Sequence, residues 1–160
     1  MRKSNREIKE QEGLNAVLEK SGVCRLALNT PEGAPYIVPL NYGYEVSENG
    51  KLTLYFHCAK EGRKLDLIHK DSRCGFEMDC SHELETGELA CQYTFYFESI
   101  IGTGMISIVE DNDERIHGLK VLMRHYGGEG KTIDERALAL TTVLRLDAVS
   151  YCGKRHERKN

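Results

Sequence analysis

The sequence predicts a mainly β protein with flanking helices, built around a six-stranded antiparallel β-barrel that is closed or partly closed. Three observations predict this class. Six segments alternate apolar and polar residues, as half-buried strands do. Short turns join several of them in hairpin fashion, which favours antiparallel pairing. Gly102 and Gly104 interrupt the longest segment, as glycines do where a strand bends at a barrel corner.

The expected elements follow one another without repeats or a low-complexity linker. The expected strands cover residues 23–29, 36–45, 51–58, 73–80, 92–109 and 141–153. The expected helices cover residues 11–20, 61–70 and 112–128, and a loop is expected over residues 81–90. We therefore expect residues 1–160 to form a single domain.

Composition excludes several classes of protein. A formal net charge of −3 does not fit a nucleic-acid binder, which is usually basic. No segment approaches the roughly 18 consecutive apolar residues of a membrane span. Residues 1–13 are polar and lack the apolar middle of a signal peptide, so we expect a cytoplasmic protein that binds neither nucleic acid nor a membrane.

The six cysteines do not form closely spaced pairs, so we predict no metal site. Four of them fall on the apolar faces of expected strands, where a free cysteine acts as a small buried hydrophobe. These four are Cys24, Cys58, Cys74 and Cys80.

Two adjacent cations mark the start of the helix expected over residues 61–70. Arg63 and Lys64 stand near the positive end of the helix dipole, where cations are disfavoured. One interpretation is a pair of solvated charges partly offset by Glu61 and Asp66. The other is an anion site, because free amides at a helix start bind phosphate and the two cations would add charge-assisted hydrogen bonds. Gly62 would let the backbone approach such an anion closely.

Pro39 interrupts the strand expected over residues 36–45. Proline cannot donate to a β-ladder, so this strand is predicted to be an edge strand or to be broken. It is either an edge blunted by proline or a place where backbone groups are free to bind a planar heterocycle. His57, near the end of the next strand, is either a surface residue or a side chain that borders such a ligand.

Taken in order, several segments resemble the pyridoxamine 5'-phosphate oxidase-related, FMN-binding split-barrel superfamily, and within it the nitroimidazole-resistance (Nim) type of flavoprotein. The segments span about residues 22–156. They are GVCRLAL, PYIVPLNYGY, LYFHCAKEGRKLDLI, CGFEMD, YFESIIGTG and VLRLDAVSYCGKRH.

The resemblance implies a homodimer with FMN at the interface. It implies that Gly62, Arg63 and Lys64 hold the FMN phosphate and that His57 and Cys58 line the phosphate and ribityl side. It implies also that backbone groups of one strand face the isoalloxazine edge, and that Ser99 approaches the ring from the partner chain. That strand segment is Val38, Pro39, Leu40 and Asn41.

The chemistry that the resemblance implies is reductive. FMN would pass electrons or hydride to a small planar acceptor such as a nitroimidazole, with His57 beside the flavin as the candidate catalytic residue. The chain ends in GKRHERKN, without the aromatic and arginine motif with which pyridoxamine-phosphate oxidases bind their substrate. Two alternatives stay open: a non-catalytic FMN-binding or redox-sensing module, and a haem-binding split barrel with a histidine ligand. The histidines are His57, His69, His82, His117, His125 and His156.

Overall fold

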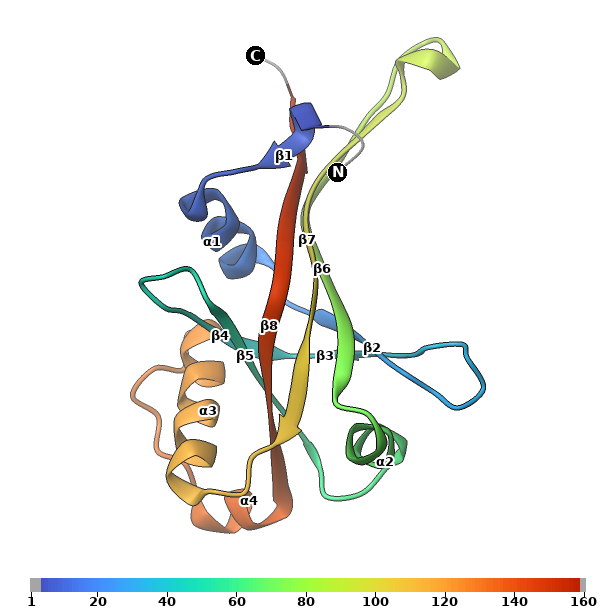
Figure 1. Ribbon diagram of the computed structural model, residues 1–160. Coiled ribbons are helices and arrows are strands. Elements are labelled where there is room, and N and C mark those ends of the chain that lie inside the picture. Colours follow the sequence, from blue (N-terminus) through green and yellow to red (C-terminus); the bar gives the residue numbers. More distant parts are fainter. Residues whose placement is uncertain (1–3, 159–160) are drawn as a thin grey trace.

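The computed structural model describes residues 4–158 and consists of eight strands, four α-helices and two short 3-10 helices (Figure 1). The helices are α1 (Gln11–Lys20), α2 (Arg63–Lys70), α3 (Asn112–His125) and α4 (Glu135–Leu140), and the 3-10 helices are Ser4–Arg6 and Ala90–Gln92. The strands are β1 (Glu7–Ile8), β2 (Cys24–Leu28), β3 (Tyr36–Leu40), β4 (Tyr42–Val46), β5 (Leu52–Ala59), β6 (Arg73–Glu85), β7 (Thr94–Ile108) and β8 (Thr141–His156).

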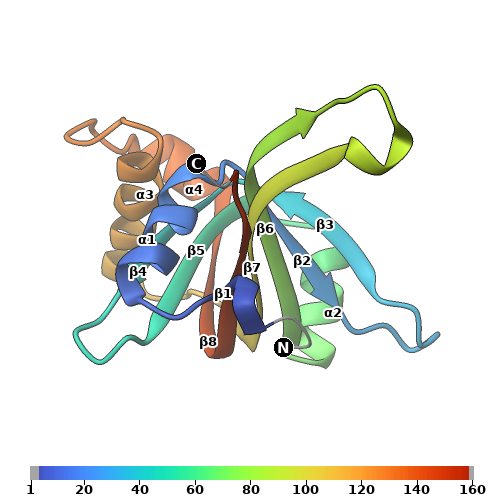
Figure 2. The same ribbon diagram turned by 90° about the horizontal axis from the view of Figure 1, so that it is seen from above.

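The strands form one antiparallel sheet, and the two strands at its ends follow one another directly in the sequence. Their order is β3-β2-β6-β7-β8-β5-β4, and β1 adds to β8. β3 and β4 lie at opposite ends of this order, yet only Asn41 separates them in the sequence. The result is the predicted mainly β split barrel, with α1, α3 and α4 on one side and α2 on the other (Figure 2).

The strand count differs from the predicted six for two reasons. The strand expected over residues 36–45 is divided at Asn41 into β3 and β4. The two-residue β1 pairs with β8 and carries no sequence signal of its own. The predicted bend in the long strand is present, because the pairing of β7 with β8 shifts register between Thr103 and Gly104.

The predicted loop over residues 81–90 is wrong in its first half. β6 continues to Glu85, and its pairing with β7 builds a hairpin, here called the arm (residues 81–97), that projects from the barrel (Figure 1). Leu84 and Phe95 lie opposite each other on the arm and are both more than half exposed. A strand exposed on both faces lacks the apolar alternation by which strands are predicted, which explains the error.

The inward faces of the strands form the core of the barrel. Cys24, Cys58, Cys74 and Cys80 are buried there as free thiols, as expected. The largest wholly buried side chains include Tyr42, Phe56, Leu26, Met78, Ile100 and Leu144.

Helix α3 lies so close to β4 that only glycine fits between them. A Cβ atom on Gly43 would lie 2.4 Å from the backbone nitrogen of Leu122. Tyr55, Val109, Val121 and Val143 form a second, smaller core beneath the same helix. This side of the barrel is therefore covered and tightly packed. None of the described helices is long and apolar enough to cross a membrane.

Candidate functional site

Two strand edges lack a β partner where the barrel opens. β4 pairs with β5 only as far as Tyr42, which lies opposite Phe56. Beyond that point β5 continues through His57–Ala59 with β8 as its one partner strand in the described chain. β3 likewise pairs with β2 and ends the strand order. The opening bounded by β3 and His57–Ala59 is called the split below.

The split exposes backbone groups that a regular sheet would pair. Pro39 lies opposite Arg25 in β3, at the end of the strand order, so the prediction of an edge or interrupted strand is confirmed. Val38 and Leu40 are half-buried and pack against the core, whereas Pro39 is exposed. Backbone N–H and C=O groups along such an edge are free to bind a ligand with donors and acceptors on its rim.

A tyrosine that the sequence analysis did not select fixes the corner of the split. The Tyr126 hydroxyl donates to the Gly22 carbonyl over 2.6 Å. It accepts hydrogen bonds from the Asn41 side-chain amide and from the Tyr42 backbone N–H, each over 3.2 Å. This one oxygen therefore links three segments: the end of α3, Gly22, and the residues at which β3 ends and β4 begins. Tyr126 directly follows the last turn of α3, and no sequence pattern relates it to Asn41.

The start of α2 lies uncapped at the other end of the split. Gly62 is the N-cap residue, with a φ of 138°, and no side chain caps the helix. Open space surrounds the position that a Cβ on Gly62 would take. The N–H groups of Leu65 and Asp66 donate to the Gly62 carbonyl, which leaves the amides of Arg63 and Lys64 without a capping side chain.

The two predicted cations stand at this helix start. The Arg63 guanidinium lies over the Tyr36 ring, 5.1 Å from its centroid, which places the start of α2 beside the start of β3. Arg63 also approaches Glu32 at 3.9 Å, but both side chains are more than 60% exposed, so this ion pair contributes little. Among the described residues Lys64 forms no ion pair, and both cations therefore remain available to an anion.

Cys58 and His57 face opposite sides of β5. Cys58 points inward, and burial raises the pKa of its thiol above the ordinary value of 9.0, although the nearby Lys64 ammonium partly offsets this effect. Cys58 is therefore a neutral thiol near pH 7 and suits a wall of the site rather than a nucleophile. His57 is exposed on the outer face, opposite Val143 and on the same side of the strand as Tyr55.

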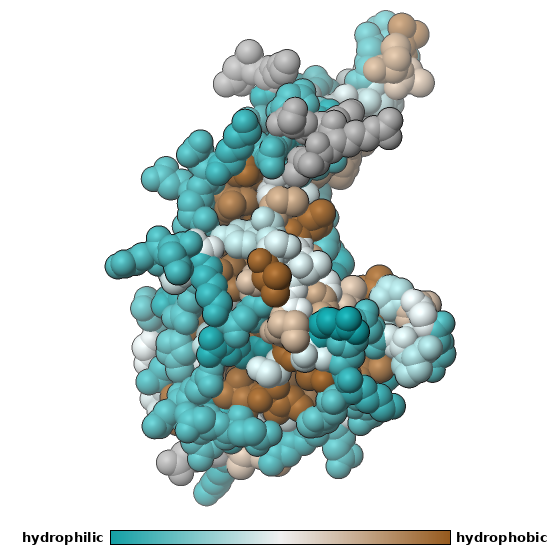
Figure 3. Space-filling view, viewed as in Figure 1, coloured by the Kyte–Doolittle hydropathy of each residue, from teal (hydrophilic) through white to brown (hydrophobic). Residues whose placement is uncertain are grey.

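Within one chain, Ser99 lies far from the split. It lies on β7 opposite Lys154 of β8, whereas His57 lies opposite Val143. These two β8 residues are eleven positions apart, which corresponds to about 35 Å along a strand. Ser99 belongs instead to an uncovered sheet face with exposed apolar side chains, and Figure 3 shows apolar surface along the middle of the molecule where β7 and β8 run. That face includes Ile101 (55% exposed) and Met105 (45%).

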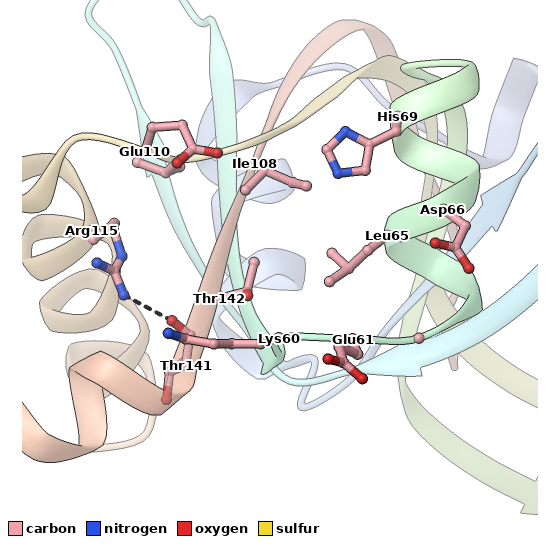
Figure 4. Close-up of a pocket in the computed structure, with 12 residues that line it drawn as sticks. Lys60, Glu61, Leu65, Asp66, His69, Ile108, Glu110, Arg115, Thr141 and Thr142 are labelled. Atoms are coloured by element: carbon pink, nitrogen blue, oxygen red, sulfur yellow. Dashed lines mark hydrogen bonds between the residues drawn. The ribbon is translucent and has the colours of Figure 1, made fainter.

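A cavity of about 670 Å³ adjoins the helix start (Figure 4). Its walls come from the loop before α2, one face of α2, the adjacent ends of β7 and β8, and Arg115 of α3. Gly62 belongs to both the cavity wall and the helix start. Its residues come from four separate segments, so no sequence pattern predicts it. Within residues 4–158, no group of three or more metal-ligating side chains is placed to hold a metal ion.

The fold and the split define a split-barrel protein with an uncapped helix start, which carries two adjacent cations, beside an open strand edge. The family model described as pyridoxamine 5'-phosphate oxidase matches residues 10–155, and the chain belongs to this family. The family resemblance is thereby confirmed.

Solved structures show the same fold. A proposed 5-nitroimidazole antibiotic resistance protein from Bacteroides thetaiotaomicron is 26% identical, with 93% of this chain and 86% of that chain covered and a TM-score of 0.79. A flavocytochrome from Azotobacter vinelandii is 16% identical, with coverage of 99% and 72% and a TM-score of 0.77. An FAD- and haem-binding protein from Mycobacterium smegmatis is 18% identical, with coverage of 96% and 74% and a TM-score of 0.79. A search of the curated proteins finds no match.

Proposed function

We propose that the protein is a cytoplasmic, FMN-binding oxidoreductase that reduces small planar acceptors such as nitroimidazoles. The observation that carries this proposal is the uncapped start of α2, with Arg63 and Lys64 side by side at the end of an unpaired strand edge. Family membership and the 26% identity to a proposed nitroimidazole resistance protein support it.

The residues present fit a flavin phosphate. A phosphate dianion at Gly62 would accept hydrogen bonds from the free amides and from both cations, and its charge would offset two cations at the positive end of a helix. A ring lying along the split would meet the backbone groups of Val38–Asn41 and the inward wall at Cys58. With the cofactor in this position, the start of α2 would bind its phosphate end and the split would bind its ring end.

A bound flavin would supply the electrons for reduction of the acceptor. A nitro group gains two electrons and two protons to give a nitroso group and water. A reduced pyridine nucleotide would restore the reduced cofactor. His57 is our candidate for the protein group that serves the acceptor. It is exposed directly beyond the last β4 pairing and can donate a proton from its ring to an acceptor oxygen. Cys58 stays a neutral wall residue.

We further propose that the protein is a homodimer with the cofactor at the interface. The uncovered sheet face that carries Ser99 exposes Ile101, Met105 and, on β8, Val149 at 73%. Contiguous apolar surface of this kind marks interaction sites. Docking of a second copy would cover this face and would let Ser99 of one protomer reach the split of its partner, which the length of β7 and β8 prevents within one chain.

An absorbance spectrum tests the proposal. Purified protein is mixed with excess FMN and desalted, and bands at about 370 and 450 nm are expected from the retained flavin. A Soret band in the protein as purified would instead support the haem alternative, and absence of both would contradict the proposal. Mixing the reduced complex with 2-methyl-5-nitroimidazole then separates an enzyme, which is reoxidised repeatedly, from a carrier, which is not.

A further inference from the structure

The arm is a two-stranded hairpin whose apolar side chains face solvent. Within residues 4–158, no third strand pairs with residues 81–96, because β8 reaches only Phe97 and β2 only Glu77. A two-stranded hairpin alone is marginally stable in water, and aromatic residues are enriched at protein interfaces. The arm therefore has the properties of an element that packs on another chain. Its large side chains that are more than half exposed are Leu84, Leu89, Tyr93 and Phe95.

A β-bulge and a buried charge fix the base of the arm. The pairing of β6 with β7 shifts register there, and Ser81 has a φ of 56°, the one positive φ of a non-glycine residue within residues 4–158. The Ser81 hydroxyl donates to the buried Glu98 carboxylate over 2.7 Å, and Lys20 and Arg155 donate to the same carboxylate. A bulge turns a strand, and a positive φ is disfavoured for a residue with a side chain. The direction of the arm is therefore held by specific contacts.

The proposed homodimer determines where each arm would lie. Ser99 lies opposite Lys154 on β8, and His57 of the split lies opposite Val143. If two antiparallel copies bring Ser99 level with the partner's split, the two-fold axis crosses β8 midway between Val143 and Lys154. This midpoint falls beside Val149, an exposed apolar side chain of the uncovered face.

At this register the arm would reach the partner's cavity. Phe95 lies two residues beyond the pair formed by Phe97 and His156, which is about nine residues along β8 from the midpoint. Leu140, directly before β8, lies about nine residues from the midpoint on the other side and is 74% exposed. Thr141, the next residue, belongs to the cavity wall. Phe95 of one protomer and Leu140 of the other would therefore meet beside the cavity.

The charges at the two ends are complementary. Glu88 is exposed near the tip of the arm, and Lys60 is exposed at the wall of the cavity. In the part of the chain that the structure describes, neither side chain forms an ion pair. Opposite charges at matching positions favour this register over one that leaves both without a partner.

We propose that the arm of each protomer lies across α4 of its partner and closes the cavity beside the partner's α2. The inference rests on the proposed homodimer. Phe95 and Leu84 of the arm pack on the partner's Leu140, and the arm tip covers the cavity next to Gly62. Each cavity is then completed by the other chain, and a monomer would leave it open.

Cross-linking of the wild-type protein tests this contact. A short maleimide–succinimide reagent is expected to join Cys91, exposed at the arm tip, to Lys60. Within one chain these residues lie at opposite ends of the molecule (Figure 1), since Thr141 and His156 alone are separated by about 50 Å along β8. Exchanged mixtures of unlabelled and nitrogen-15-labelled protein should give cross-linked peptides with one light and one heavy half. Cys91→Ser is the control and should abolish them.

A substitution on the arm provides a second measurement. Phe95→Asp would place a carboxylate in both symmetric contacts, so we expect the dimer dissociation constant to rise at least about tenfold in sedimentation experiments. Phe95→Leu is the matched control, because it keeps an apolar side chain, and it should change the constant by less than about threefold.

The outcomes separate the arm from the rest of the proposed function. A dimer without the cross-link between Cys91 and Lys60, or with unchanged dissociation in Phe95→Asp, would overturn the inference and leave the homodimer standing. A monomer would overturn both, and the FMN spectrum would still decide flavin binding. The cross-link in a protein that binds no flavin would support the arm contact and contradict the flavin proposal.

Discussion

β3 and β4 are two halves of one alternating segment, yet they lie in opposite environments. β4 pairs with β5 and lies under α3, with Tyr42 and Gly43 buried. β3 pairs with β2, and its Ile37 and Pro39 are exposed. We call them the closed half and the open half. Alternation predicted both as strand. Within the described chain each half has one partner strand, but α3 covers β4 and does not cover β3. The open half is thereby left with backbone groups available for binding.

Gly43→Ala should break the closed half and have the largest effect on stability. The new Cβ would meet the backbone of Leu122 at 2.4 Å, and two backbone segments cannot separate without losing the packing between β4 and α3. We expect a loss of about 3 kcal/mol or more in the free energy of unfolding, measured by denaturant titration. Gly22→Ala is the control, since its Cβ would meet nothing within 4 Å. Equal midpoints for the two variants would contradict the close packing.

His57→Ala should act on the split and leave the closed half unchanged. If His57 donates a proton to the acceptor, nitroimidazole turnover falls by about a hundredfold while FMN affinity stays within about twofold. His117→Ala is the matched control, because His117 is exposed over the closed half and bonds to Glu45 at 2.9 Å. A parallel loss of turnover and FMN affinity in His57→Ala would make His57 a cofactor contact only.

Tyr126→Phe should loosen the corner between the two halves. Removal of the hydroxyl leaves the Tyr42 N–H and the Gly22 carbonyl short of a partner, so we expect a loss of about 1–2 kcal/mol in unfolding free energy. FMN affinity should fall several-fold as well, because Asn41 loses its support. Among residues 4–158, the Tyr44 hydroxyl bonds to the exposed Glu19 alone, so Tyr44→Phe should change neither. Wild-type behaviour of Tyr126→Phe would remove Tyr126 from the site.

The pairing of β5 with β8 should also weaken slightly in acid. Burial would raise the pKa of Asp147, but hydrogen bonds from Arg145, Lys51 and Thr53 outweigh it and hold this pKa below the ordinary value of 3.8. Because the folded pKa is the lower one, the stabilisation is complete well above pH 3.8 and is lost as the pH falls through the folded value.

Asp147→Asn should therefore reduce the acid dependence of unfolding by less than about 1 kcal/mol, measured as midpoints between pH 5 and pH 2. Asp113→Asn, at an exposed carboxylate in the first turn of α3, provides the comparison. An unchanged profile in Asp147→Asn would show that the Asp147 contacts contribute nothing to the pairing of β5 with β8.

Local patterns predicted the parts of this molecule that depend on neighbouring residues. Alternation located the six barrel strands, and the cations after a strand end located the start of α2. Pro39 predicted an unpaired strand edge because the lack of a backbone N–H donor is a property of proline itself. The Tyr126 hydroxyl, the cavity beside Gly62 and the arm depend instead on contacts between distant segments, or on strands exposed on both faces. The place of Ser99, far along β7 from the split, likewise depends on strand pairing between distant segments.

A titration of FMN into wild-type protein and into the double variant Arg63→Ala, Lys64→Ala tests the phosphate site most directly. Each charged hydrogen bond contributes about 1.5–3 kcal/mol, so the double variant should bind FMN at least about tenfold more weakly. Lys70→Ala with Lys131→Ala removes the same charge from exposed positions outside the split and should retain wild-type affinity. Undiminished FMN affinity in a folded Arg63→Ala, Lys64→Ala protein would contradict the proposal that the start of α2 binds the flavin phosphate.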